Sequence, residues 1–238
     1  MGAPGKTPGQ APGEGRRLPA PLIGAGLIAA ALVLVLLGGL VVDRWPFGFD
    51  RAILTSLRHW GGPPWLAGAA INVTALGSGT VLTIVVLAVA GLLLVQRLPL
   101  TAAATIAACW SGGRIVDLAK TYFARARPDI VDHLVPVTHA SFPSGHAASS
   151  AVCYLTLAAL ASQVTRDRAT RRYVAIVAIL LVGAIGTSRV YLGVHWPSDV
   201  LAGWCFGTLW ALGWWFATAR ARASLGGERQ HALLDGER

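Results

Sequence analysis

Charged residues are scarce in this sequence. Asp, Glu, Lys and Arg together make up 13% of the 238 residues, whereas hydrophobic residues make up 54%. A soluble domain usually devotes about a quarter of its residues to charge. The apolar residues also come in long runs rather than at the spaced intervals of a soluble core. The composition therefore argues against a water-soluble domain and predicts an integral membrane protein.

The sequence also lacks the patterns that form disulfides or bind metals. Cys109, Cys153 and Cys205 lie in apolar stretches without CxxC or Cys/His spacing, so we interpret them as small apolar residues. Asp129 and Asp132 do not have the spacing of metal ligands, and we interpret them as solvated loop acids. We expect neither a metal nor another cofactor.

Long apolar runs predict that the chain crosses the bilayer repeatedly. A crossing takes roughly 20 helical residues for about 30 Å of hydrocarbon. Runs of suitable length cover residues 22–42, 72–95, 98–119, 144–164, 173–191 and 197–217. The first is too long for the apolar part of a signal peptide and is followed by Asp43-Arg44-Trp45 rather than a cleavage site. The predicted fold class is all-α, a polytopic membrane protein with six transmembrane helices in a bundle.

The ends of the chain differ from its centre. Residues 1–20 are rich in Pro and Gly, and residues 218–238 are polar and charged, so both are expected to be flexible tails flanking a membrane domain over residues 21–217. The stretch 65–95 lacks charge and exceeds one crossing. We therefore expect its first part to lie in the membrane interface, with the amphipathic segment 47–60.

The net charge of +9 is explained better by topology than by nucleic-acid binding, because the basic residues are spread along loops. With a cytoplasmic N-terminus, the positive-inside rule is satisfied, and the cluster at 166–172 decides the orientation. The residues then inside are Lys6, Arg16, Arg17, Arg97, Arg166, Arg168, Arg171, Arg172, Arg220, Arg222, Arg229 and Arg238. We predict a plasma-membrane protein with both termini in the cytoplasm.

Several polar residues converge on one membrane face, the extracytoplasmic one in this topology. Successive spans alternate in direction, so the end of the third, the start of the fourth, the end of the fifth and the start of the sixth emerge together. Charged groups at such depth must pair, snorkel or serve a site. Snorkelling explains each singly, but their convergence favours a site. The residues are Lys120, Arg127, Ser144, Gly145, His146, Ser188, Arg189, His195 and Asp199.

The cations of this group suit an anion with several oxygens. Guanidinium groups of Arg127 and Arg189 match phosphate, and the Lys120 ammonium adds a point charge. The stretch FPSGHAASS (142–150) opens a helix whose free N–H groups bind anions, with Gly145 allowing close approach and Ser144 adding a hydroxyl. By itself that stretch is also typical of an ordinary capped helix start.

Two histidines have distinct expected roles. Asp199 lies four residues after His195 and can orient its imidazole, leaving the other ring nitrogen free to attack phosphorus. His146 enters from another helix and is placed to protonate the leaving group and then to activate water. We interpret His59, His133, His139 and His231 as structural, and Asp117 as an ion-pair partner of Arg114 and Lys120.

These stretches resemble a known family. KTYFARARP (120–128), PSGH (143–146) and SRVYLGVHWPSD (188–199) match the pattern K-x6-RP, PSGH, SR-x5-H-x3-D of the type 2 phosphatidic acid phosphatases, which are related to acid phosphatases and vanadate-dependent haloperoxidases. The resemblance implies a metal-independent, six-helix membrane enzyme that removes phosphate from lipids. It also implies phosphate binding by Lys120, Arg127, Ser144, Gly145 and Arg189, with His146 as acid, His195 as nucleophile and Asp199 as its partner.

The leading hypothesis is thus a lipid phosphatase that works through a phosphohistidine. Its candidate substrates are a polyprenyl diphosphate, phosphatidylglycerol phosphate and phosphatidic acid, which the sequence does not rank. The alternatives are an enzyme holding vanadate, like a haloperoxidase, and a transporter or binding protein for phosphorylated solutes. Transport would need polar groups deeper in the spans, where apart from Arg114 and Asp117 they are scarce. The expected partners are the membrane and a lipid phosphate; the sequence does not indicate an oligomeric state.

Overall fold

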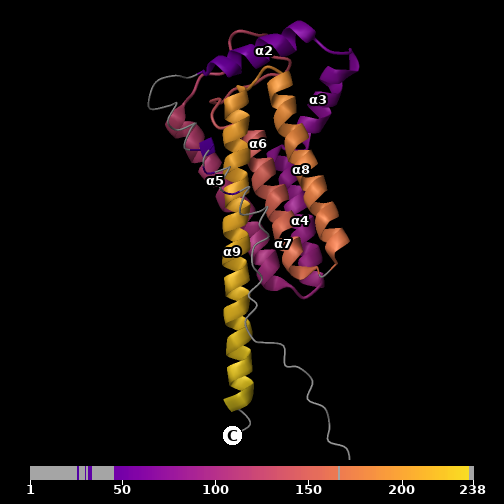
Figure 1. The fold of residues 1–238 in the computed structure, drawn as a ribbon, viewed down its shortest axis with the longest axis vertical. Helices are drawn as coiled ribbons and strands as arrows, with labels where there is room; N and C mark the ends of the chain where they lie inside the picture. The colour runs from indigo at the N-terminus through magenta and orange to yellow at the C-terminus, as the bar shows by residue number, and fades with distance from the viewer. Residues whose placement is uncertain (1–25, 27–29, 31, 34–45, 166, 236–238) are drawn as a thin grey trace, which may run out of the picture.

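The computed structural model describes residues 26, 30, 32–33, 46–165 and 167–235, and this part of the chain is helical, with connecting loops and no strand. Most of its helices run side by side along the long axis of the molecule, whereas α2 lies across one end (Figure 1). Their bounds are α2 Gly48–Trp60, α3 Trp65–Ala75, α4 Gly79–Val95, α5 Pro99–Phe123, α6 Gly145–Ser150, η1 Ala151–Leu155, α7 Thr156–Val164, α8 Arg168–Tyr191 and α9 Pro197–Asp235. The predicted all-α class is confirmed.

Within the described residues, three helices are long and apolar enough to cross a membrane: Gly145–Val164, Arg168–Tyr191 and Pro197–Ser224. The pair α3 and α4 adds a fourth crossing if the two helices, bent by 49°, form one span. Helix α5 has 25 residues but falls outside this set. Its second half carries Arg114, Asp117 and Lys120. The first expected span, residues 22–42, lies largely outside the described residues.

The second expected span, residues 72–95, is wrong at its start. Helix α3 ends at Ala75 and α4 begins only at Gly79. The Ser78 hydroxyl caps the new helix by accepting from the Val81 N–H at 3.4 Å. A Cβ at Gly77 would lie 2.6 Å from Ile185 Cγ2 and 3.2 Å from the His146 carbonyl oxygen, so a glycine there lets the break pack against α6 and α8.

Two other helices extend beyond their expected bounds. Helix α8 begins five residues before the expected start at 173, because the Asp167 carboxylate accepts from the N–H groups of Ala169 (3.2 Å) and Thr170 (2.7 Å). Helix α9 continues to Asp235, through residues for which a flexible C-terminal tail was expected. The composition change at 218 therefore does not end the helix.

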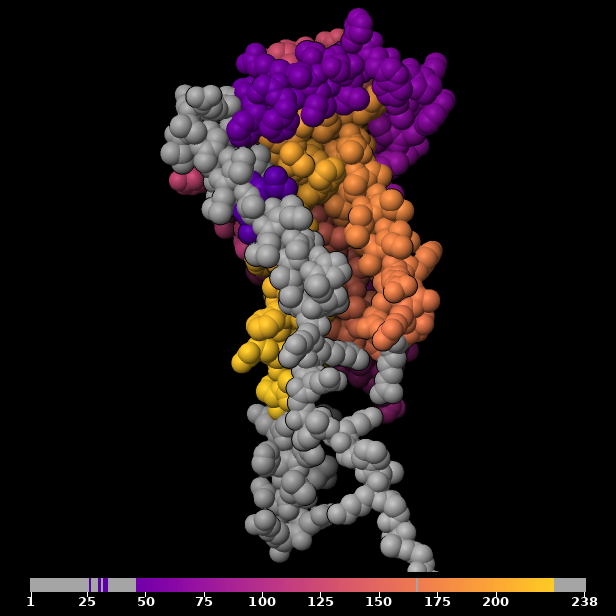
Figure 2. All heavy atoms as spheres, in the orientation of Figure 1, coloured from indigo at the N-terminus to yellow at the C-terminus, as the bar shows by residue number. Residues whose placement is uncertain are grey.

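Helix α2 is amphipathic, as predicted, and packs across the ends of α8 and α9. With α3 it covers that end of the bundle (Figure 2). Its Leu54 is buried, whereas Trp60 on the same helix is exposed. Two contacts attach this region to the loop after α5 and to the end of α8. Arg58 Nη2 donates to the Asp132 carbonyl oxygen at 2.5 Å, and the hydroxyl of Tyr191, the last residue of α8, donates to the Gly61 carbonyl oxygen at 2.8 Å.

Small residues bring α9 close to the helix formed by α6, η1 and α7. A Cβ added at Gly207 would lie 2.3 Å from Ala151 Cβ and 2.7 Å from the Val152 backbone nitrogen. Close approach of this kind is how helices associate in membranes, where van der Waals packing replaces the hydrophobic effect. The contact holds α9 against η1.

Replacing Gly207 by Ala should destabilise the bundle, because backbone rather than a flexible side chain blocks the new methyl group. We expect a loss of about 1–3 kcal/mol, seen as a lower thermal midpoint of the detergent-solubilised protein. Gly213→Ala on the same helix is the matched control, since nothing lies within 4 Å of its added Cβ. Equal midpoints for the two variants would contradict the packing described.

Candidate active site

A cavity of about 790 Å³ lies among α3, α5, α6, α8 and the loops that precede α6 and α9. It brings together most of the residues predicted from sequence, although they come from four separate stretches of chain. The predicted residues that line it are Lys120, Arg127, Gly145, His146, Arg189 and His195. The described structure thus confirms their convergence, and the imidazole of His195 shares one cavity with all three cations.

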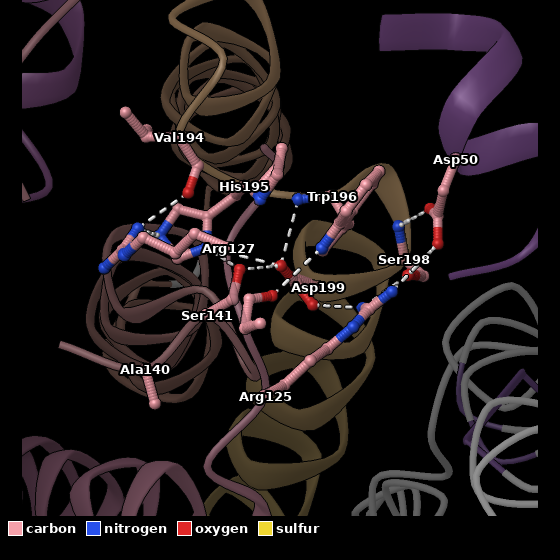
Figure 3. A network of polar contacts seen from close by, with 12 residues as sticks. Asp50, Arg125, Arg127, Ala140, Ser141, Val194, His195, Trp196, Ser198 and Asp199 are labelled. Atoms are coloured by element: carbon pink, nitrogen blue, oxygen red, sulfur yellow. Dashed lines mark hydrogen bonds and ion pairs between the residues drawn. The ribbon is translucent and has the colours of Figure 1, made fainter. Parts of the chain in front are cut away.

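His195 and Asp199 are paired as expected. His195 Nδ1 lies 3.4 Å from Asp199 Oδ2, and both side chains are buried. The same carboxylate oxygen also accepts from the Trp196 N–H at 2.9 Å and from the Ser141 hydroxyl (Figure 3). A carboxylate held by several donors cannot turn freely, so it sets the orientation of the ring.

The second nitrogen of His195 faces Arg127. Arg127 Nη1 lies 3.2 Å from His195 Nε2 and 2.7 Å from the Val194 carbonyl oxygen, and its Nε donates to the His139 carbonyl oxygen at 2.6 Å. A guanidinium can only donate, so Nε2 is the acceptor and Nδ1 carries the proton that faces Asp199. The Nε2 lone pair is therefore directed at the guanidinium of Arg127, and both His195 and Arg127 line the cavity.

The protonation state of His195 fits this arrangement. Burial, the largest cause, together with the charges of Arg127 and Arg189, lowers the pKa of His195 to about 4, although the hydrogen bond to Asp199 acts to raise this pKa. The imidazole is then neutral at pH 7. A neutral imidazole is the form that can act as a nucleophile.

Lys120 is oriented toward the start of α6. Lys120 Nζ donates to the Ala140 carbonyl oxygen at 3.0 Å, and a Cβ at Gly145 would lie 3.1 Å from Lys120 Cε. The glycine therefore leaves the room in which the lysine crosses the helix start. The expected ion pair of Asp117 with Arg114 is present at 3.9 Å, but both side chains are exposed and the ammonium of Lys120 turns to Ala140 instead.

Two buried polar atoms of the site have no hydrogen-bond partner among the described residues. They are Ser144 Oγ and Arg189 Nε. Arg189 is otherwise attached through Nη1, which donates to Thr74 Oγ1 at 3.3 Å. An unsatisfied buried donor costs about 1–3 kcal/mol. Both atoms are donors of the kind that a phosphate oxygen would satisfy.

Sequence reasoning missed several residues near this centre. Arg125 binds Asp199 from the side opposite His195, and it also binds Asp50, a fully buried acid on α2. The Ser141 hydroxyl donates to Asp199, and the Thr74 hydroxyl accepts from Arg189. A lone acid within an amphipathic segment was the available indication for Asp50. The spacing of Arg125 did not distinguish it from an ordinary basic residue in a loop.

His139 lines the cavity with an exposed side chain, whereas we interpreted it from the sequence as a structural residue.

Comparison with known proteins gives a consistent result. Residues 96–223 match the PAP2 superfamily. The chain is 30% identical over 158 residues to phosphatidylglycerophosphatase B of Bacillus subtilis, which covers 61% of this chain and 72% of that protein. It is 38% identical over 71 residues to an undecaprenyl-diphosphatase of Sulfolobus acidocaldarius, but this match covers only 30% of each chain.

Two solved structures share this fold. The crystal structure of a transmembrane PAP2 type phosphatidylglycerolphosphate phosphatase from Bacillus subtilis superposes with a TM-score of 0.68 at 24% identity, covering 85% of this chain and 96% of that one. The structure of Aquifex aeolicus LpxE gives a TM-score of 0.57 at 25% identity, covering 71% of this chain and 96% of that one.

The lowered pKa of His195 predicts a specific acid sensitivity. An unfolded histidine has a pKa of about 6.5, so between about 6.5 and 4 the unfolded chain binds more protons than the folded one. The contribution of His195 to the free energy of unfolding is fully present above pH 6.5 and is lost as the pH falls toward 4. The thermal midpoint of the wild-type protein should thus fall more steeply over this window than that of His195→Gln. Parallel curves would show that the buried ring is not neutral as described.

Proposed function

The chain belongs to the PAP2 superfamily, a family of metal-independent membrane phosphatases, and on this premise we propose that the cavity at His195 removes a phosphoryl group from a lipid through a phosphohistidine. One observation carries the site assignment. Lys120, Arg127 and Arg189 surround a single cavity with both predicted histidines. Such a set of cations stabilises the charge that develops on a transferring phosphoryl group.

The first step is the attack of His195 Nε2 on phosphorus. Asp199 holds the Nδ1 proton, and Arg127 lies 3.2 Å from the attacking nitrogen, where it can bind an equatorial phosphoryl oxygen. The new N–P bond forms as the bond from phosphorus to the leaving oxygen breaks. His146, which also lines the cavity, donates a proton to that oxygen.

The second step returns the enzyme to its starting state. His146, now without its proton, takes one from a water molecule that attacks the phosphohistidine. The N–P bond breaks, His195 regains its lone pair and inorganic phosphate leaves. We propose that the phosphoryl oxygens are held through both steps by Lys120, Arg189, Ser144 and the backbone at Gly145. In support, Ser144 Oγ and Arg189 Nε are buried and have no hydrogen-bond partner among the residues that the structure describes.

For the substrate, we propose phosphatidylglycerol phosphate first and a polyprenyl diphosphate second. The relative that covers most of this chain is a phosphatidylglycerophosphatase, whereas the undecaprenyl-diphosphatase matches only a short stretch. The volume of about 790 Å³ leaves room for more than one phosphoryl group. Phosphatidic acid, with the smallest headgroup, is the third candidate.

We further propose the six-span arrangement, with residues 22–42, the α3–α4 pair and α5 completing the set of spans. Arg168, Arg171 and Arg172 begin α8 at the end of the bundle opposite α2 (Figure 1). The positive-inside rule then favours a cytoplasmic location for that end and for both termini in the plasma membrane. The cavity accordingly faces the extracytoplasmic side. Residues 21–217 form the phosphatase domain in this proposal.

The nucleophile can be tested in the purified full chain in detergent. Phosphate release from phosphatidylglycerol phosphate, a polyprenyl diphosphate and phosphatidic acid should fall at least about 10³-fold in His195→Ala, because the covalent route is lost. His59→Ala is the control, an exposed histidine on α2 outside the cavity. A chelator should leave wild-type turnover unchanged. Activity that survives in His195→Ala would refute the nucleophile.

The orientation of the chain can be tested by labelling single cysteines in cells. In a background without Cys109, Cys153 and Cys205, Asp129→Cys should react with a membrane-impermeant maleimide in intact cells. Gln96→Cys, in the turn between α4 and α5, should react only after the membrane is opened. Both positions are exposed in the structure, so access depends on the side of the membrane. The reverse pattern would invert the proposed topology.

A further inference from the structure

Two charged residues outside the cavity are buried beside Asp199. Asp50 of α2 is 0% exposed, and the side chain of Arg125, in the loop after α5, is 8% exposed. Neither lines the cavity. Buried charges carry a desolvation penalty of several kcal/mol each unless they are paired and hydrogen-bonded. The pairing of Asp50 with Arg125 can therefore contribute either to the stability of the protein or to the chemistry at Asp199.

The guanidinium of Arg125 connects the two carboxylates. Its Nη2 lies 3.1 Å from Asp50 Oδ2, while Nη1 binds Asp199 Oδ1 and lies 2.8 Å from Ser198 Oγ (Figure 3). The ring of Trp196 lies under the same group, with the guanidinium carbon 5.5 Å from the ring centroid. Arg125 is therefore held in one position by contacts on several sides.

The two oxygens of Asp199 have separate partners. Oδ1 binds Arg125, whereas Oδ2 faces His195 Nδ1 and accepts from Trp196 and Ser141. Because each oxygen is held by a different group, the plane of the carboxylate cannot rotate. Loss of Arg125 would free one oxygen and allow Oδ2 to leave the line of the Nδ1–H bond.

Asp50 fixes the start of α9, the helix that carries Asp199. Its Oδ1 accepts from the Ser198 N–H at 2.8 Å and its Oδ2 from the Ser198 hydroxyl at 2.7 Å. The Ser198 N–H belongs to the first turn of α9, where helical partners are missing. Oδ2 also accepts from the Phe47 N–H at 3.1 Å, at the start of α2. One side chain thus joins the first turns of two helices.

We propose that Asp50 and Arg125 are positioning residues of the hydrolytic reaction, which act through Asp199 to orient the His195 ring and connect α2 to the nucleophile. This inference rests on the proposed function, because it assumes that His195 attacks. Neither residue touches the phosphoryl group. Their contribution is to the geometry of attack, and hence to kcat, rather than to substrate binding.

The experiment compares Asp50→Asn, Arg125→Gln and Arg125→Lys with the wild-type full chain in detergent. Asp50→Asn and Arg125→Gln should lower kcat about 10- to 100-fold, the loss typical when a group that orients a reactive histidine is removed. The KM and the inhibition constant of inorganic phosphate should change less than about twofold, because Lys120, Arg127 and Arg189 remain. Arg125→Lys should recover part of kcat, since it restores the charge but not the two-sided contact.

Arg58→Gln is the matched control. Arg58 also attaches α2 to the rest of the protein, because it donates to the Asp132 carbonyl oxygen in the loop after α5. No hydrogen bond or ion pair joins Arg58 to Asp199 in the described structure. Its kcat should stay within about twofold of wild type even if its thermal midpoint falls. If Arg58→Gln lowers kcat as much as Asp50→Asn does, loosening of α2 explains the effect and the positioning role is overturned.

Three further results would overturn the inference. The first is a kcat that is unchanged in both Asp50→Asn and Arg125→Gln. The second is inhibition by inorganic phosphate that weakens in parallel with kcat. The third is a kcat of Arg125→Lys that is no higher than that of Arg125→Gln. If Arg125→Gln does not fold, Asp50→Asn, which is nearly isosteric, decides the question. Measuring His195→Ala in the same experiment separates the proposed function from the positioning role. If His195→Ala is active, the proposed function is refuted. If His195→Ala is inactive but Asp50→Asn has wild-type kcat, only the positioning role is refuted.

Discussion

The burial of the Asp199 carboxylate is the constraint on which the rest of the site depends. A charge with no exposed surface at the start of an apolar helix must be compensated by its neighbours. Here the compensation comes from Arg125, Ser141 and the Trp196 N–H. The contacts that stabilise the Asp199 charge also hold the His195 ring. The same geometry therefore meets the electrostatic requirement and orients the proposed nucleophile.

The same balance explains why the cavity is suited to an anion. Among the residues that line the cavity, Lys120, Arg127 and Arg189 outnumber the one carboxylate, Asp117. Within the described part of the chain, the buried atoms Arg189 Nε and Ser144 Oγ have no hydrogen-bond partner. On the other side of His195, carboxylates and cations alternate through Asp199, Arg125 and Asp50 (Figure 3). Within the described residues, no salt bridge joins Lys120, Arg127 or Arg189 to a carboxylate, whereas Arg125 is paired with both Asp50 and Asp199. This excess of positive charge suits the proposed phosphoryl group. In a low-dielectric setting such preorganised donors are worth far more than in water.

Sequence predicted the convergence but not the details of the helices. Alternating spans require Lys120, His146, Arg189 and His195 to meet at one end, and they share one cavity. The break between α3 and α4 was missed, because a continuous apolar run hides the packing of Gly77 against α6 and α8. The extent of α9 was missed as well. The composition becomes polar at residue 218, but polar residues can also be helical, and α9 continues beyond this position.

The amino-acid sequence by itself determined the fold class, the membrane setting and most of the charged residues around the cavity, since apolar run lengths and motif spacing are local properties of the chain. Only the tertiary structure decided which atoms pair. It placed Arg127 beside His195 Nε2, turned Lys120 to Ala140, and brought Asp50 to Arg125 across 75 residues of sequence. Hydrogen bonds depend on distances of about 3 Å between helices packed together, and no period or spacing along the chain carries that information.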